Sequence, residues 1–161
     1  KLMVPLIFEP YALDLARRAQ ALRPSQVLEI AAGTGAVTRQ LAQALPPSCP
    51  LTATDLNPAM LEEARRRGTV RPVEWQVADA MQLPFEDAGF DLVACQFGAM
   101  FFPDKPHAYA EVRRVLIDAR AAQSDAADIR STITVDAGTQ SLDRPETSPI
   151  VAAVKKLTAQ A

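Results

Sequence analysis

The sequence predicts an α/β fold in which a doubly wound, mostly parallel sheet carries helices on both faces. Short apolar runs alternate with helical patterns up to Leu116, which is typical of parallel strands joined by crossover helices. The run from Val27 to Gly35 joins an apolar strand to a glycine-rich turn, and a helical pattern follows at once. Acidic residues, Asp55 and Asp79, follow the next two expected strands. We therefore expect residues 1–116 to form one core organised around the turn.

The first third of the chain predicts two helices on either side of a strand. Apolar residues recur at three-residue spacing from Phe8 to Leu22, which favours a helix. Pro24 disfavours helix in the residue before it, so this helix ends there. The strand Gln26–Ile30 follows, then the glycine turn, and then a helix over 36–45 that Pro46 stops.

The next helix has clear signals at both of its ends. It follows a second strand over Leu51–Thr54, and Asn57 suits the N-cap with Pro58 at the first helical position. The basic run Arg65–Arg67 suits a helix C-terminus, and Gly68 is the expected C-terminal cap. A binding patch is the alternative interpretation of the arginines, but capping and solvation explain them more simply.

Two more strands and one helix complete the predicted core. The strands are expected over Val73–Val77 and Phe90–Cys95, separated by a polar loop over 84–89. The last helix is expected over Lys105–Leu116.

Beyond the core, residues 117–161 read as a divergent C-terminal segment that is poor in large apolar side chains. Residues 130–135 predict a possible fifth strand, and residues 149–157 a short helix. Between them, the composition of residues 138–148 is typical of a loop or linker.

Composition excludes several classes of function. The 161 residues carry a net charge of −2 with no basic stripe, so no nucleic-acid partner is expected. No apolar run approaches the ~20 residues of a membrane span. Two cysteines make no disulfide framework or metal set, and the one histidine, His107, argues against a metal centre. We expect a cytoplasmic protein without a metal; the oligomeric state is not predicted.

The strand ends suggest a pocket for a nucleoside-type ligand. Glycine lets a ligand approach bare backbone, and parallel sheets bind ligands at the carboxyl ends of their strands. Asp55 can accept hydrogen bonds from two ribose hydroxyls. The alternative is that it only helps to start the helix that Asn57 caps. Asp79 can accept from an exocyclic amine, and Gln96 and Phe97 end the fourth strand at the switch point of the sheet.

A dinucleotide pocket is the competing interpretation of the turn. The G-x-G-x-x-G pattern requires a third glycine where this chain has Thr38. Glu29, inside the first strand, is not part of that pattern either. A nicotinamide-dependent oxidoreductase therefore remains a weaker alternative.

The motifs taken together resemble class I S-adenosylmethionine-dependent methyltransferases, and most closely the quinone-biosynthesis (UbiE/COQ5-like) group. Val27–Gly35 is similar to the family's first motif, E-x-A-x-G-x-G, and Thr54–Leu61 to its second. Residues 78–85 followed by Phe90–Val93 are similar to the third and fourth motifs. The resemblance covers residues 5–116 and implies the Rossmann-like methyltransferase fold.

The resemblance also implies S-adenosylmethionine as cofactor and a role for each matching position. Glu29 would anchor the turn near the cofactor's amino group, and Asp55 would bind the ribose. Asp79 would accept from the adenine amine. The remaining implied positions contribute backbone or apolar contacts and are Ala31, Gly33, Gly35, Leu56, Ala80, Gln96 and Phe97. No catalytic residue is implied.

The family's glycine-containing turn after the last helix is replaced here by Ile117–Arg120. The acceptor-binding part is therefore not recognisable. The sequence predicts methyl transfer to a small-molecule acceptor, with an S-adenosylmethionine-binding domain without catalysis as the alternative.

Overall fold

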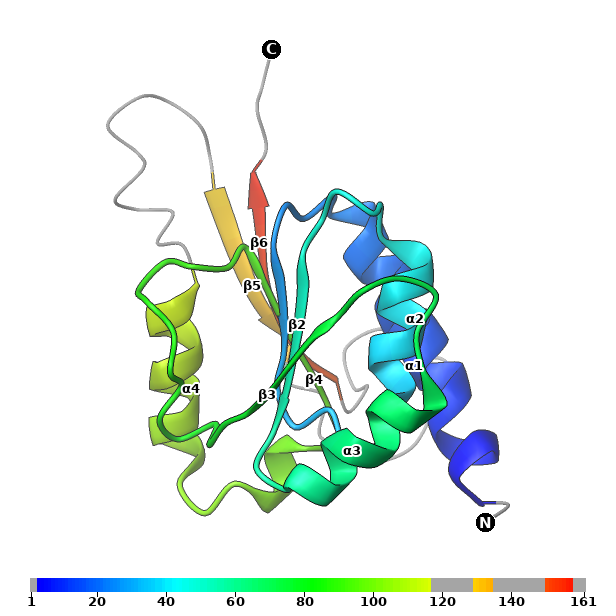
Figure 1. Cartoon of the computed structure of the whole chain (residues 1–161). Helices are drawn as coiled ribbons and strands as arrows, with labels where there is room; N and C mark the ends of the chain where they lie inside the picture. The colour runs from blue at the N-terminus through cyan, green and yellow to red at the C-terminus, as the bar shows by residue number, and fades with distance from the viewer. Residues whose placement is uncertain (1–2, 117–128, 135–149, 158–161) are drawn as a thin grey trace.

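The computed structural model describes residues 3–116, 129–134 and 150–157. Within these, a six-stranded sheet is flanked by four α-helices (Figure 1). The helices and strands, in chain order, are α1 (Met3–Ala21), β1 (Val27–Glu29), α2 (Ala36–Ala44), β2 (Leu51–Asp55), α3 (Pro58–Arg67), β3 (Glu74–Val77), β4 (Leu92–Gln96), the 3₁₀ helix Ala99–Phe101, α4 (Lys105–Val115), β5 (Ile129–Thr134) and β6 (Ile150–Leu157).

The sheet has the strand order β3-β2-β1-β4-β6-β5, and its first four strands are parallel. β1 lies between β2 and β4, with Leu28 paired to Thr52 on one side and to Val93 on the other. The order reverses direction at β1, since the chain moves outward to β3 and then returns to β4 on the other side. The carboxyl ends of β1 and β4 therefore meet at the switch point, where such sheets bind ligands.

Helices cover both faces of the sheet, as the alternating pattern predicts. α1, α2 and α3 lie on one side and α4 on the other (Figure 1). The first core cluster packs α1 and α2 against the sheet through residues such as Leu15 and Leu41. The second packs α4 against it through Val112, Val115 and Phe90. Two buried layers thus hold the strand ends in a fixed arrangement.

The predicted elements of the core are confirmed, with shifts at their ends; the largest is at the first helix, which begins at Met3 rather than Phe8. Asn57 caps α3 by accepting from the N–H of Ala59, and Gly68 is its C-cap. The fourth strand starts at Leu92 rather than Phe90, because Phe90 forms a separate bridge to Leu116. The three arginines that end α3 are exposed, in agreement with capping and solvation.

The predicted short helix at residues 149–157 is wrong, because this segment is the strand β6. It pairs antiparallel with β4 through Leu92–Val154 and Gln96–Ile150, and β5 pairs with its other edge. A short apolar run fits a strand or a helix equally well by periodicity. The open edge of β4 decides between them, because it offers unpaired backbone groups. The expected strand at 130–135 is confirmed as β5, and the expected linker at 138–148 lies outside the described residues.

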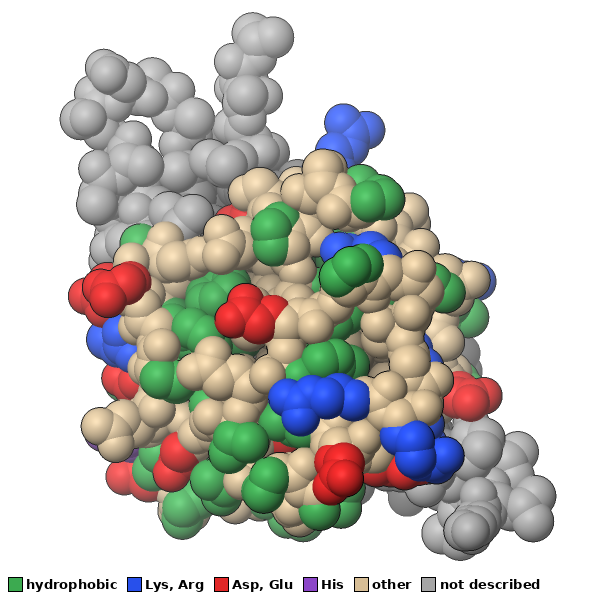
Figure 2. All heavy atoms as spheres, in the orientation of Figure 1, with side chains coloured by type: hydrophobic (Ala, Val, Ile, Leu, Met, Phe, Trp, Pro, Cys, Tyr) green, Lys and Arg blue, Asp and Glu red, His purple; other side chains and the backbone are tan. Residues whose placement is uncertain are grey.

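Among the described residues, no helix is both long and apolar enough to span a bilayer. On the face seen in Figure 2, basic and acidic side chains are interspersed rather than gathered into one patch of a single sign.

Candidate functional site

A cavity of about 590 Å³ opens at the carboxyl ends of the parallel strands. It is lined by the glycine turn, by the ends of β2 and β4, by the residues after β3 and by the 3₁₀ helix. Its lining residues are Glu29, Ala31, Ala32, Gly33, Thr34, Ala36, Val37, Asp55, Leu56, Met60, Ala78, Asp79, Ala80, Met81, Gln96, Phe97, Gly98, Phe101, Phe102 and Pro103. All predicted site residues except Gly35 are therefore brought together in one place.

The turn after β1 winds through left-handed backbone conformations. Ala31, Gly33 and Gly35 have φ values of 53°, 56° and 75°. The N–H of Ala32 donates to the carbonyl of Thr54 at 2.9 Å, which ties the turn to β2. Left-handed backbone is costly for a residue with a Cβ, so the strained Ala31 is held by its surroundings.

The two glycines of the turn have different surroundings. A Cβ built on Gly33 meets no atom within 4 Å, so this residue presents bare backbone to the cavity. A Cβ on Gly35 would stand 3.1 Å from both Ala64 and Trp75. The second glycine thus permits close packing against α3 and β3, whereas the sequence reasoning placed it in the cofactor cradle.

Asp55 links the end of β2 to the turn. Its Oδ2 accepts from the N–H of Gly33 at 2.7 Å, and its Oδ1 accepts from the N–H of Asn57 at 2.9 Å. The carboxylate therefore binds both the turn and the start of α3. The bond to Asn57 agrees with the alternative in which Asp55 begins the helix, whereas the ribose contact stays a prediction. Each oxygen keeps further acceptor capacity toward the cavity, because a carboxylate offers about four lone-pair sites.

Glu29 is a buried acid at the end of β1. Its Oε2 accepts from the hydroxyl of Thr38 at 2.6 Å. Complete burial raises the pKa of this carboxyl from 4.5 to about 8, and the hydrogen bond from Thr38 offsets this only in part. In the free protein the side chain therefore carries a proton at neutral pH, which a cationic ligand would displace.

Asp79 marks the start of a tight turn after β3. Its Oδ1 accepts from the N–H of Met81 at 2.8 Å, and its carbonyl accepts from the N–H of Gln82 at 3.0 Å. Asp79 is exposed and lines the cavity beside Ala80. Leu56, directly after β2, is also exposed and lines the same cavity.

The end of β4 adds a buried polar group, the side-chain amide of Gln96. The Nε2 of Gln96 is buried and makes no hydrogen bond within the part of the chain that the structure describes. The next residue, Phe97, has a φ of 58° and packs edge-to-face on Tyr11 with ring centroids 5.5 Å apart. A Cβ at Gly98 would collide with that of Ala31, so β4 leaves the sheet directly over the turn.

Among the residues that sequence reasoning missed are the aromatic part of the cavity wall and the hydrogen-bond partner of Glu29. Phe101, Phe102 and Pro103 line one side of the cavity, and Phe101 is 80% exposed. The aromatic pair Phe101–Phe102, five residues beyond the end of the fourth strand, was the available signal. Thr38 was noted only as the missing third glycine, although its position in the first turn of α2 brings it under β1.

His107 and Cys95 lie outside the cavity lining. His107 is exposed at the start of α4 and does not line the cavity. Cys95 is buried, and burial raises the pKa of its thiol to about 12. No cluster of metal-ligating side chains occurs among the described residues.

Comparison with known proteins gives a consistent result. The family model described as "Methyltransferase domain" matches residues 27–119. The demethylmenaquinone methyltransferase of Deinococcus radiodurans is 36% identical over 103 residues, which are 63% of this chain and 42% of that protein. The ubiquinone/menaquinone biosynthesis C-methyltransferase UbiE of Burkholderia mallei is 44% identical over 103 residues, covering 60% and 42% of the two chains.

The fold agrees with that of solved structures. The YcgJ protein of Bacillus subtilis superposes with a TM-score of 0.58 and 30% identity, over 66% of this chain and 46% of that one. The present chain spans about two-fifths of the length of the curated relatives it matches. The matched region contains the glycine turn, the cavity and all four parallel strands. The chain therefore belongs to the class I S-adenosylmethionine-dependent methyltransferases.

Proposed function

We propose that this chain binds S-adenosylmethionine in the cavity at the switch point and forms the catalytic core of a methyltransferase. The observation that carries this is the placement of three acids, Glu29, Asp55 and Asp79, at the ends of successive strands around one cavity. An ammonium, a pair of ribose hydroxyls and an exocyclic amine are all hydrogen-bond donors. The three acids therefore suit a ligand that presents an ammonium near Glu29, two ribose hydroxyls near Asp55 and an exocyclic amine near Asp79.

The residues present fit this cofactor. Gly33 leaves open space where the ligand would lie on the backbone. The carboxyl of Glu29 can give up its proton to face a cationic amine. The Nε2 of Gln96, which is unpaired among the described residues, can donate to a ligand oxygen. Leu56, Ala80 and Phe97 supply apolar or backbone surface on the cavity wall.

When bound, the cofactor supplies a methyl group on a sulfonium, which is already activated for in-line displacement. The protein's part is then to orient the acceptor and to exclude water. Phe101, Phe102 and Pro103 provide an apolar wall for that purpose. No side chain of the described part is assigned as a general base, and His107 does not line the cavity.

For the acceptor we propose a small aromatic molecule of the quinone precursor class, methylated at carbon. The support is the similarity to relatives named as demethylmenaquinone and ubiquinone/menaquinone methyltransferases. The aromatic side chains of the cavity wall suit a flat, apolar acceptor ring.

Two measurements test this function. S-adenosylhomocysteine should raise the melting temperature of the chain, and radiolabelled methyl groups should pass from S-adenosylmethionine to a demethylated quinol but not to amines of similar size. Absence of any thermal shift would contradict cofactor binding. A thermal shift without methyl transfer to any of a panel of quinols, phenols and amines would support a cofactor-binding domain without catalysis. It would refute the proposed methyltransferase activity.

The two turn glycines provide a prediction that separates binding from folding. Gly33→Ala should cost about 1 kcal/mol of stability through its left-handed backbone, yet weaken S-adenosylhomocysteine binding strongly, because the new methyl stands in the cavity wall. Gly35→Ala should cost about 2–3 kcal/mol, because its methyl also presses on Ala64 and Trp75. Urea unfolding and calorimetric binding measure both effects. Equal losses of stability in the two variants would contradict the inference that Gly35 is closely packed whereas Gly33 faces open space.

A further inference from the structure

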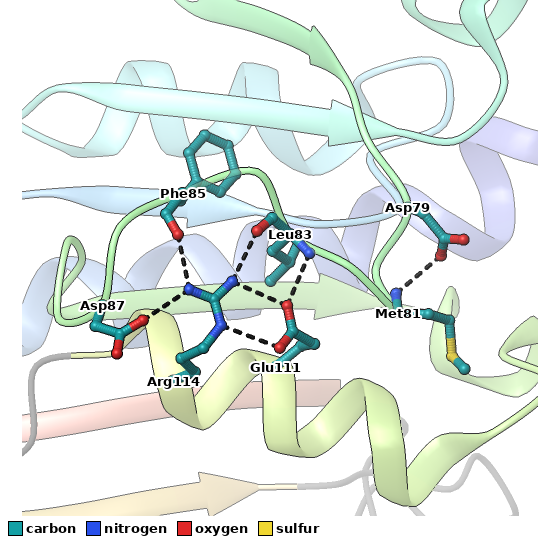
Figure 3. Close-up of polar contacts among 7 residues, drawn as sticks. All are labelled: Asp79, Met81, Leu83, Phe85, Asp87, Glu111 and Arg114. Atoms are coloured by element: carbon teal, nitrogen blue, oxygen red, sulfur yellow. Dashed lines mark hydrogen bonds and ion pairs between the residues drawn. The ribbon is translucent and has the colours of Figure 1, made fainter.

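The segment from Leu83 to Asp87 has no strand partner in the described part of the chain, although it follows directly on the turn that carries Asp79. No strand is assigned between Val77 and Leu92. The peptide groups of such a segment need other partners when they are turned inward. In this chain two side chains of α4 provide them (Figure 3).

Arg114 donates to three places on the segment. Its Nη2 reaches the carbonyl of Leu83 at 2.7 Å, and its Nη1 reaches the carbonyl of Phe85 and the carboxylate of Asp87, each at 2.8 Å. Glu111 accepts from the N–H of Leu83 at 2.9 Å. The planar, five-donor guanidinium holds several acceptors in one fixed geometry, whereas the three donors of a lysine ammonium share a single nitrogen and rotate.

The two side chains also hold each other. Glu111 accepts from Nε of Arg114 at 3.0 Å and from Nη2 at 2.9 Å, a bidentate pair. The hydrogen bond from Arg114 lowers the pKa of the Glu111 carboxyl, so the pair stays ionised. The main chain adds to this, because the N–H of Ala88 donates to the carbonyl of Arg114 at 2.9 Å.

Leu83 directly follows the tight turn that begins at Asp79 and ends at Gln82. Asp79 and Gln82 form a bridge, and the N–H of Met81 is held by the Asp79 carboxylate. Leu83 itself is buried in the core cluster beneath α4. A shift at Leu83 therefore moves a tight turn whose other end lines the cavity, whereas neither Glu111 nor Arg114 lines it.

We propose that Glu111 and Arg114 are positioning residues that fix the turn at Asp79, and thereby make the cavity select a base with an exocyclic amine. This rests on the proposed function, in which the Asp79 carboxylate accepts from the adenine amine. A base with a carbonyl oxygen in that place presents an acceptor to an acceptor and is rejected, but only while the turn is held. If the turn is loosened, the Asp79 carboxylate can move away from the base. The preference for the amine over the carbonyl then decreases before overall binding is lost.

The test compares dissociation constants for S-adenosylhomocysteine and for its deaminated analogue, in which a carbonyl oxygen replaces the 6-amino group. The wild-type chain should prefer the amine by about tenfold or more, as expected for one hydrogen bond lost to a mismatched pair. Arg114→Lys and Glu111→Gln, which are mild enough to fold, should reduce the preference to less than about threefold. Arg113→Gln is the matched control, since Arg113 is the exposed neighbour on α4, and it should leave the preference unchanged.

A role in stability alone gives a different result. It would lower the melting temperature of the Arg114 and Glu111 variants while leaving the ratio of the two constants as in the wild type, and that outcome overturns the proposal. Asp79→Asn should reduce the preference as much as Arg114→Lys, and the double variant should add nothing further. Additive effects would also overturn it. If the wild-type chain binds S-adenosylhomocysteine without preference, the role of Asp79 is wrong; if it binds neither compound, the proposed function itself fails.

Discussion

Asp55→Ala is expected to abolish the thermal stabilisation by S-adenosylhomocysteine, with a loss of affinity of about 100-fold or more. In the proposed complex this carboxylate accepts from two ribose hydroxyls, and hydrogen bonds to a charged group are the strong ones. The same carboxylate accepts from the N–H of Gly33, so its removal also releases the turn on which the ligand would lie. One substitution thus removes both a direct contact and the support beneath it.

Calorimetric titration of Asp55→Ala and Asp55→Asn separates these two effects. Asn keeps one side-chain oxygen for the N–H of Gly33 but loses the acceptor for the N–H of Asn57, so Asp55→Asn should lose less stability than Asp55→Ala while binding at least about tenfold more weakly. Asp14→Ala, at an exposed acid on α1 paired with Arg18, is the control and should bind normally. A wild-type thermal shift in Asp55→Ala would refute the ribose assignment.

Glu29→Gln is expected to change how the stability of the protein depends on pH. Because the pKa of Glu29 is raised to about 8 in the folded protein from 4.5, the folded state holds a proton that the unfolded chain releases. The stability of the wild type therefore contains a contribution that is complete below about pH 4.5 and is lost as the pH rises to about 8. Gln is neutral at every pH and can still accept from Thr38, so the variant lacks this decline.

The size of the effect follows from the shift. The difference in free energy of unfolding between Glu29→Gln and the wild type should grow in favour of the variant by on the order of 4 kcal/mol between pH 4.5 and pH 8. Urea unfolding at intervals across this range measures it without ligand. Glu62→Gln, at an exposed position of α3, should run parallel to the wild type. Parallel profiles for Glu29→Gln as well would show that Glu29 is ionised in the free protein.

Ligand affinity should depend on pH in the opposite direction to stability: it should increase as the pH rises and Glu29 ionises. A cationic amine is bound best by the ionised carboxylate, so wild-type affinity should rise as the pH approaches 8, and binding at pH 7 should release a proton. Titration in two buffers with different heats of ionisation detects that proton. Glu29→Gln should bind weakly and release none. Proton uptake by the wild type would contradict the assignment of Glu29 to the amine.

The elements of the core were predictable because their signals are local. An apolar strand, a glycine turn and a capped helix each depend on neighbours within a few residues, and Asn57 and Gly68 lie at the α3 ends that their chemistry predicts. The segment at 150–157 was not predictable in this way. Its apolar residues suit either type of element, and the choice of strand depends on pairing with β4, which is remote in sequence.

The sequence by itself determined where the acids and the glycine turn lie on the strands, and hence the fold class and the family. Strand ends in a parallel sheet meet at one edge, so a local pattern was enough to bring Glu29, Asp55 and Asp79 to one cavity. Only the tertiary structure assigned Gly35 to packing, gave Glu29 its partner Thr38, and joined Arg114 to the segment after β3. These contacts join residues from separate elements, so they depend on how the elements pack together. Local sequence patterns do not predict that packing.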